Sequence, residues 1–169
     1  LERGGQVSTL DVAYSYSVFA TLGSMRGVPT EPVARGFRGR DPVAILEIRD
    51  ADGALIWQYD MQEAATCGTL DVCTLLLEDK LAYVVNDVLA DQETRWSVQG
   101  QNTALDLSRP GAVVNGMTSD RTDNWTVGYT PQYVVSVAFS RADGTPMSLN
   151  TFGLNGAAPV WRALMEYVH

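Results

Sequence analysis

The residues that could do chemistry are concentrated between Arg109 and Pro131. Two carboxylates, Asp120 and Asp123, lie three positions apart in this stretch and could pair near a strand turn. Aspartates in a short polar segment commonly form the turn itself and face solvent. We therefore interpret Asp120 and Asp123 as turn residues rather than as an acid–base pair.

No complete set of residues for nucleophilic catalysis can be assembled from this sequence. A serine–histidine–acid triad would need His169, the only histidine, and a terminal residue is expected to be frayed. A cysteine nucleophile would lack a well-placed base, and metal sites would lack ligands beyond carboxylates. The only lysine, Lys80, lies in the first turn of a predicted helix, and we interpret it as a surface residue. We predict no catalytic residue, no metal site and no cofactor in this chain.

The two cysteines, Cys67 and Cys73, are separated by five residues, enough for a small loop to close into a disulfide. Two ordinary thiols in a loop would give the same spacing. A zinc site is disfavoured, because there is no other cysteine and the only histidine is terminal. The spacing alone leaves the disulfide and the two thiols open.

Strands on both sides of a polar turn must position the residues of the 109–131 stretch. The first, Gly111–Val114, is small and β-branched and leads into Asn115-Gly116. The second, Trp125–Tyr129, alternates aromatic and valine side chains with threonine and glycine. A third strand, Tyr133–Arg141, is apolar on both faces, which predicts a central or covered strand.

Three helices are predicted. Ser8–Gly23 has Ser8 as its cap and Asp11 as the capping-box partner, and its near lack of a polar face predicts burial on most sides. Glu78–Asp91 has apolar residues at helical spacing. Ala158–Val168 closes the chain with one apolar stripe.

The segment between the first two helices reads as a loop followed by a hairpin. Met25–Pro42 is rich in glycine, proline and arginine, and we interpret it as a solvated connection. Its arginines could instead form an anion-binding patch: Arg35, Arg38 and Arg40. Val43–Tyr59 contains an Asp-Gly turn between two apolar runs and predicts a hairpin.

The 109–131 stretch carries a resemblance to a known family. It reads R-P-G-A-V-V-N-G-M-T-S-D and later D-N-W-T-V-G-Y-T-P. It resembles the third active-site strand of penicillin-binding transpeptidases, especially those of bifunctional class A peptidoglycan synthases, which read roughly R-P-x-A-G-K-T-G-T-T-N-D and D-x-W-x-V-G-Y-T-P. The first helix, V-S-T-L-D-V-A-Y-S-Y-S-V-F-A-T-L-G, resembles the family helix T-P-L-E-M-A-x-A-Y-x-x-F-A-N-G-G. The resemblance covers Val7 to Val168 and corresponds to the C-terminal half of a transpeptidase domain.

The sequence departs from the family pattern at the positions that bind substrate in the family. The family lysine falls at Val114, and the threonines on either side of Gly116 fall at Asn115 and Met117, while Thr118 matches. In the family these positions bind the substrate carboxylate, so a valine here removes the cation and its three donors. The candidate substrate-binding strand is therefore a degenerate K-T-G motif: Val114, Asn115, Gly116, Met117 and Thr118.

The resemblance implies an α+β fold, a partial β-lactamase/transpeptidase-like fold with an antiparallel sheet packed by helices, in one domain over residues 1–169. It implies a catalytically defective portion with a scaffolding or binding role in peptidoglycan synthesis. The alternative is part of an active D,D-transpeptidase whose serine lies upstream or on another chain. Partners would be peptidoglycan stem peptides or cell-wall synthesis proteins. The implied location is extracytoplasmic, with anchoring through a longer parent protein, and this favours a Cys67–Cys73 disulfide.

Composition excludes several other classes. The chain has 169 residues, 46 % hydrophobic and 19 % charged, which suits one globular domain. Its net charge of −8 argues against a nucleic-acid partner. No apolar run reaches the roughly 18–20 residues of a membrane span. An exposed sheet edge could support a homodimer.

Overall fold

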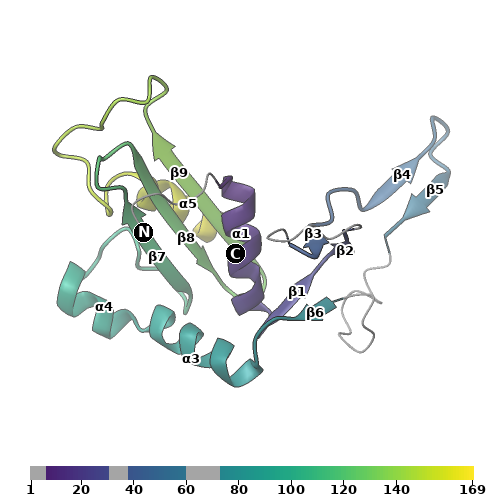
Figure 1. The fold of residues 1–169 in the computed structure, drawn as a ribbon, viewed down its shortest axis with the longest axis horizontal. Coiled ribbons are helices and arrows are strands. Elements are labelled where there is room, and N and C mark those ends of the chain that lie inside the picture. The colour runs from purple at the N-terminus through teal and green to yellow at the C-terminus, as the bar shows by residue number, and fades with distance from the viewer. Residues whose placement is uncertain (1–6, 31–37, 60–72) are drawn as a thin grey trace.

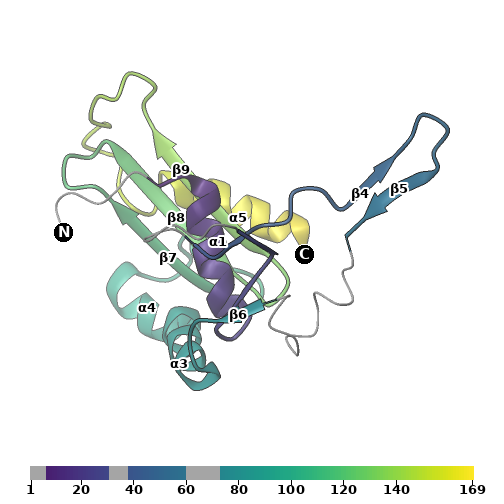
Figure 2. The same cartoon turned by 45° about the vertical axis from the view of Figure 1, so that its right-hand side comes forward.

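A three-stranded antiparallel sheet between two helices forms the body of the protein (Figures 1 and 2). The computed structural model describes residues 7–30, 38–59 and 73–169. Helix α1 (Thr9–Ala20) covers one face of the sheet, and helix α5 (Ala157–Val168) covers the other. This arrangement confirms the predicted α+β class with an antiparallel sheet packed by helices.

The sheet consists of β7 (Ala112–Met117), β8 (Asp123–Tyr129) and β9 (Val134–Ser140), in that order. Its ladders run without a register shift along the whole of each strand pair. Among the described residues β9 pairs with β8 alone, so β8 is the central strand. The third strand was predicted to be either central or covered. β9 is not central, but α1 and α5 contact it, so it is a covered strand.

Alternation along β8 gives the two faces of the sheet different partners. Tyr129 faces α1, where its ring centroid lies 6.2 Å from that of Tyr16. Asn124 and Gly128 face α5, and the amide oxygen of Asn124 accepts a hydrogen bond from the Ala157 backbone N–H at 2.6 Å. Both helices are thus held on the sheet by side chains of the central strand.

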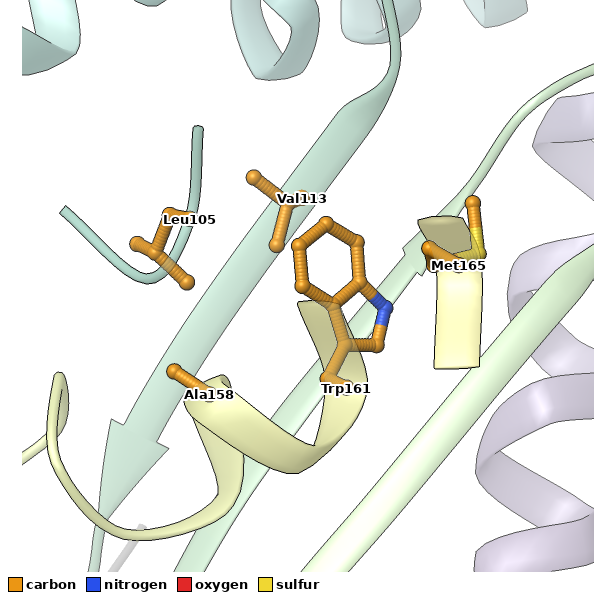
Figure 3. Packing of buried hydrophobic residues seen from close by; sticks show 5 residues of the cluster. All are labelled: Leu105, Val113, Ala158, Trp161 and Met165. Atoms are coloured by element: carbon orange, nitrogen blue, oxygen red, sulfur yellow. The ribbon is translucent and has the colours of Figure 1, made fainter. Parts of the chain in front are cut away.

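The hydrophobic core lies between the sheet and α5 (Figure 3). Trp161 is fully buried and lies over Gly128, where a Cβ atom would come within 2.3 Å of Cζ2 of the indole. Only glycine leaves room for the ring at this strand position. The cluster has five buried members: Leu105, Val113, Ala158, Trp161 and Met165.

Helix α1 begins as predicted but is less buried than predicted. The Ser8 hydroxyl accepts from the Asp11 backbone N–H, and the Asp11 carboxylate accepts from the Ser8 backbone N–H, which completes the capping box. Within the helix only Tyr14 and Val18 are buried, and Leu10 is 56 % exposed. Burial on most sides was therefore wrong, although α1 contacts the sheet, α3 and β1.

Helix α3 (Asp79–Ala90) confirms the predicted periodic helix, but its apolar stripe does not form core. The helix turns Ala82 inward, and Asn86 donates to the Phe19 carbonyl at 3.0 Å. The side chains of the stripe that remain most exposed are Leu81, Val84 and Val88. The periodic pattern therefore predicted helix α3 correctly, but it predicted the wrong side of the helix to be buried.

A helix that the sequence analysis missed, α4 (Gln92–Gln99), follows directly. The Asp91 carboxylate caps it by accepting from the Thr94 backbone N–H at 2.9 Å. Trp96 Nε1 donates to the Asp106 carboxylate at 3.1 Å, which ties α4 to the segment before β7.

Short strands replace much of the loop predicted after the first helix. β1 (Ser24–Arg26) pairs with β6 (Cys73–Leu75), and β2 (Val28–Pro29) pairs with β3 (Arg40–Asp41). The β1–β6 pair brings together segments roughly fifty residues apart, which a local pattern does not reveal.

The arginines of this region are engaged within the protein. Arg38 forms ion pairs with Asp11 and Asp41. Arg40 is buried and donates to the Gly27 carbonyl at 2.9 Å. An anion-binding patch is not formed by these two side chains, and Arg35 lies outside the described residues.

The predicted hairpin is present as β4 (Glu47–Arg49) and β5 (Leu55–Gln58), and it projects from the body (Figures 1 and 2). Its turn is held by Asp50, whose carboxylate accepts from the backbone N–H groups of Asp52 at 2.9 Å and Ala54 at 2.8 Å. Every residue of both strands is exposed.

Candidate functional site

The candidate site is a groove between the first turns of α1 and the sheet, beside the end of β7. Its cavity volume is about 410 Å³. Burial raises the pKa of the Tyr16 phenol in this groove, so the phenol stays neutral at neutral pH. Among the described residues, the lining contains no charged side chain and consists of Val7, Val12, Tyr16, Val114, Asn115, Gly116, Trp125 and Val127.

Val114 forms part of the groove wall. Its neighbour Val113 belongs to the core under α5, so alternation turns Val114 to the α1 side. Across the ladder Val114 lies opposite Val127, and both residues line the groove. Valine offers no hydrogen-bond donor and no charge. The position at which the resemblance puts a lysine is therefore an apolar wall.

Asn115 contributes to the groove, and its amide is engaged by neighbouring segments. Gln99 Nε2 of α4 donates to Asn115 Oδ1 at 3.4 Å, a long hydrogen bond. A Cβ atom on Gly153 would lie 2.3 Å from Asn115 Nδ2, so the loop before α5 lies directly against the amide. These contacts give Asn115 a structural part in joining β7 to α4 and to that loop.

The last residues of the motif lead into the β7–β8 turn. Gly116 is exposed, with no atom within 4 Å of the place of a Cβ, and Met117 is half-buried. The Thr118 hydroxyl accepts from the backbone N–H groups of Thr122 at 3.1 Å and Asp123 at 3.0 Å. Thr118 therefore stabilises the turn rather than lining the groove.

The two aspartates belong to the same turn. Asp120 Oδ1 accepts from the Thr122 hydroxyl at 2.9 Å. Hydrogen bonding by Thr118, and then by Thr122, holds the pKa of Asp120 below its ordinary value. This geometry agrees with the turn interpretation of Asp120 and Asp123.

Two residues that the sequence analysis missed brace the strand pair. Arg121 adopts a positive φ of 62° and donates to the Thr151 carbonyl at 3.0 Å and to the Ser148 carbonyl. Asn124 is fully buried and donates to the Gly116 carbonyl at 3.3 Å. Nothing local in the sequence indicates these bonds, because their partners are brought close only by the fold.

Ser148-Leu149-Asn150 lies in the loop before α5. The Ser148 hydroxyl accepts from the Asn150 backbone N–H at 3.3 Å and therefore stabilises a local turn. Neither residue lines the groove.

His169 is more ordered than expected for a terminal residue. Its Nε2 lies 2.9 Å from the Thr130 hydroxyl, and its ring packs edge-on against Tyr133 with centroids 5.1 Å apart. These two contacts place the ring against Thr130 and Tyr133. Neither contact brings an acid or a serine to the imidazole, so no triad is formed by them.

The predicted disulfide involves a residue that the structure does not describe. Cys73 is buried at the start of β6, while Cys67 lies outside the described residues, so their pairing stays a prediction. Across residues 7–30, 38–59 and 73–169, no cluster of three metal-ligating side chains is found. No helix of these ranges has the length and apolarity to cross a membrane.

Comparison with known proteins finds relatives of one kind. No family model matches the chain. Penicillin-binding protein 1A of Rickettsia bellii is 29 % identical over 113 residues, which cover 61 % of this chain and 14 % of that protein. Penicillin-binding protein 1A of Rickettsia felis is 24 % identical over 144 residues, which cover 79 % and 18 %.

The fold also has a solved counterpart. The crystal structure of penicillin-binding protein 1A from Haemophilus influenzae matches 96 % of this chain with a TM-score of 0.68 at 14 % identity. The match covers 26 % of that protein's chain, so this chain spans only a part of the proteins it resembles. The chain is therefore similar in sequence to a part of penicillin-binding protein 1A and shares its transpeptidase-like fold.

Proposed function

We propose that this chain is a catalytically defective transpeptidase-like portion with a binding or scaffolding role in peptidoglycan synthesis. One observation carries the proposal: the groove beside β7 is walled by Val114 where the resemblance puts a cation. The names of the relatives support the peptidoglycan role. The proposed location is outside the cytoplasmic membrane, with anchoring through a longer parent protein.

The groove as it stands suits an apolar contact better than a carboxylate. A carboxylate that enters it loses hydration and gains no charged partner from the lining. A hydrogen bond to a charged group contributes about 1.5–3 kcal/mol, or roughly 10- to 100-fold in affinity. We therefore expect weak, carboxylate-independent binding of peptidoglycan stem peptides, which fits a scaffold rather than a catalyst.

An alternative role is favoured by the intact scaffold of the motif. The β7–β8 ladder has no register shift, and Gly128 and Tyr129 occupy defined places against Trp161 and Tyr16. Such a strand pair could complete an active D,D-transpeptidase whose serine lies upstream or on another chain. Under this alternative, Val114→Lys in the full-length parent should strongly raise acylation by penicillin.

Intact mass after incubation with a reactive penicillin tests catalytic competence. The 169-residue chain should show no adduct beside an untreated control, because it lacks a serine–lysine nucleophile. A stoichiometric adduct would show that a serine of this chain is activated, and the catalytically defective assignment would be wrong.

A titration with a stem pentapeptide tests the groove directly. The wild type should bind weakly, with equal affinity for the same peptide amidated at its C-terminus. Val114→Lys should bind the free carboxylate at least about tenfold more tightly than wild type. Val98→Lys is the matched control, because Val98 is 84 % exposed on α4 and its substitution adds the same charge away from the groove. Tight, carboxylate-dependent binding by the wild type would refute the role assigned to Val114.

A further inference from the structure

A second cavity lies at the other end of α1 from the groove, where α1 and α3 meet the start of β7 and the end of β8 (Figure 1). We call it the α1–α3 cavity. Its volume is about 190 Å³, and it is partly open to solvent. Six of its nine lining residues have small side chains that leave the space between the four elements unfilled: Ala20, Ala90, Pro110, Gly111, Ala112 and Pro131.

Hydrogen bonds hold the polar wall of the α1–α3 cavity, which consists of Asn86, Tyr129 and Thr130. Tyr129 Oη donates to Asn86 Oδ1 at 2.6 Å, and Asn86 Nδ2 donates to the Phe19 carbonyl at 3.0 Å. These two bonds join β8, α3 and α1. Thr130 is buried, and its hydroxyl lies 2.9 Å from His169 Nε2. The folded chain therefore forms the cavity before any ligand enters, as is typical of small-molecule sites.

The polar wall retains the capacity to bind one hydroxyl group. Tyr129 has donated its only hydroxyl hydrogen, but its oxygen can still accept a hydrogen bond. Asn86 Nδ2 carries two hydrogens, and the hydrogen bonds of the described residues use one of them. A ligand hydroxyl can therefore donate to Tyr129 Oη and accept from Asn86 Nδ2. None of the nine lining residues, all of which are described, carries a charge, so a charged ligand would lose hydration without gaining a partner.

The size of the α1–α3 cavity limits the ligand to one ring. An apolar cavity of about 150 Å³ can hold a benzene molecule, whereas drug-sized ligands occupy pockets of about 300–1,000 Å³. At about 190 Å³, the cavity accommodates a single six-membered ring with one small substituent. The alanine and proline side chains of the lining offer the apolar surface against which such a ring is removed from water.

We propose that the α1–α3 cavity binds a neutral small molecule that consists of one six-membered ring with a hydroxyl group, such as a phenol. The ring lies among the alanine and proline side chains, and the hydroxyl group lies at the Asn86–Tyr129 pair. Because so small a ligand makes few contacts, we expect a dissociation constant on the order of 1 mM. The inference goes beyond the proposed function, since Tyr16 lines the groove and Tyr129 lines the cavity, and their paired rings separate the two sites.

A nitrogen-15 NMR titration of the 169-residue chain with phenol tests the proposal. The backbone amides of Ala20, Ala90 and Gly111 should shift saturably between about 0.1 and 20 mM phenol. The nitrogen-15 shift of Asn86 Nδ2 should move with phenol and stay in place with toluene, which has the same ring without the hydroxyl. Benzoate adds a charge and 1-naphthol adds a second ring, so each should bind at least about tenfold more weakly than phenol.

Two variants that fill the α1–α3 cavity test its location. Ala90→Leu and Ala20→Leu each enlarge a lining side chain, and each should weaken phenol binding at least about tenfold. Leucine and alanine are both strong helix formers, so α3 and α1 should persist, which circular dichroism checks. Ala163→Leu is the matched control, because Ala163 is exposed on α5, on the opposite face of the sheet, and its substitution should leave phenol binding unchanged.

Several results would overturn the inference. Shifts that do not saturate by about 20 mM phenol would exclude a site of this strength. Wild-type affinity in both filled variants, or equal weakening by Ala90→Leu and Ala163→Leu, would place phenol elsewhere. Benzoate or 1-naphthol that binds as tightly as phenol would refute the assigned charge or size of the ligand. Binding of the stem pentapeptide at the groove should be the same in the wild type and in Ala90→Leu, so failure of this inference and failure of the proposed function give different results.

Discussion

The closest packing in the core predicts a large effect from one added methyl group, in Gly128→Ala. A Cβ atom at Gly128 would lie 2.3 Å from Cζ2 and 2.8 Å from Cε2 of Trp161, and 2.6 Å from the Ala112 carbonyl oxygen. The indole cannot withdraw, because it is fully buried between its own helix α5 and the sheet, where it packs with Leu105 and Val113. The carbonyl cannot withdraw either, because it belongs to the β7 backbone within the sheet.

The expected loss follows from two opposing effects. Replacing glycine by alanine where space allows stabilises a protein by about 0.4–1 kcal/mol, through the unfolded chain. Overpacking a filled core costs about 1–3 kcal/mol. Because contacts on both sides of Gly128 are blocked, we expect overpacking near its upper limit and a net loss of about 2 kcal/mol. Gly116 lies in the same sheet, and a Cβ atom there would have no atom within 4 Å. Gly116→Ala should therefore leave the stability unchanged or raise it slightly.

Urea unfolding followed by circular dichroism measures the difference. With a slope of about 2 kcal/mol per molar urea, Gly128→Ala should lower the midpoint by about 1 M at an unchanged slope, and Gly116→Ala should not lower it. If the two variants unfold at the same urea concentration, the reasoning about Trp161 and the Ala112 carbonyl is wrong, because these close contacts distinguish Gly128 from Gly116.

Three further predictions concern protons and the brace on the strand pair. Burial raises the pKa of Tyr14 to about 12 and that of Tyr129 to about 12. The unfolded chain releases these protons near pH 10, so stability should be full below about pH 10 and fall towards pH 12. Burial also raises the pKa of Tyr16, so an ultraviolet absorbance titration should show three late phenols, one of them lost in Tyr129→Phe, and ordinary titration of all seven tyrosines would contradict this. Thr118→Val should raise the pKa of Asp120 towards its ordinary value, as followed by carboxyl carbon-13 NMR, and an unmoved pKa would exclude the turn hydroxyl as the cause. Arg121→Ala should speed amide hydrogen exchange in the loop before α5, which loses two carbonyl contacts; unchanged exchange would show that other contacts hold this loop.

The elements with strong local signals were predictable from the sequence. The capping box at Ser8 and Asp11 and the alternation of Trp125, Val127 and Tyr129 each act within a few residues. The valine at position 114 was also visible, because it is a matter of residue type, while its reading as a degenerate motif stays a prediction. These features depend on short stretches of chain, whatever the rest of the fold does.

What could not be predicted depends on contacts between distant segments. Ser24 lies opposite Leu75 in a strand pair that no local pattern indicates. The stripe of α3 has helical spacing, but packing on α1 and β7 buries Ala82 and leaves Val84 exposed. At the site, Arg121 donates to the Thr151 carbonyl, thirty residues further along the sequence. The residue type of Arg121 alone therefore could not predict this contact.

The buried amide of Asn124 has a consequence for how this chain can vary in length. It accepts from the first backbone N–H of α5 and donates to Gly116, while β9 is fixed independently by its ladder to β8. The β8–β9 ladder and the Asn124 side chain therefore anchor the two ends of the connection between β9 and α5, and neither anchor uses the residues of the connection. Extending a loop adds only about 0.6 kcal/mol for each doubling of its length. The exposed tip at Asp143-Gly144 is thus the place where insertions should accumulate in evolution, and where a peptide tag could be inserted with the fold preserved.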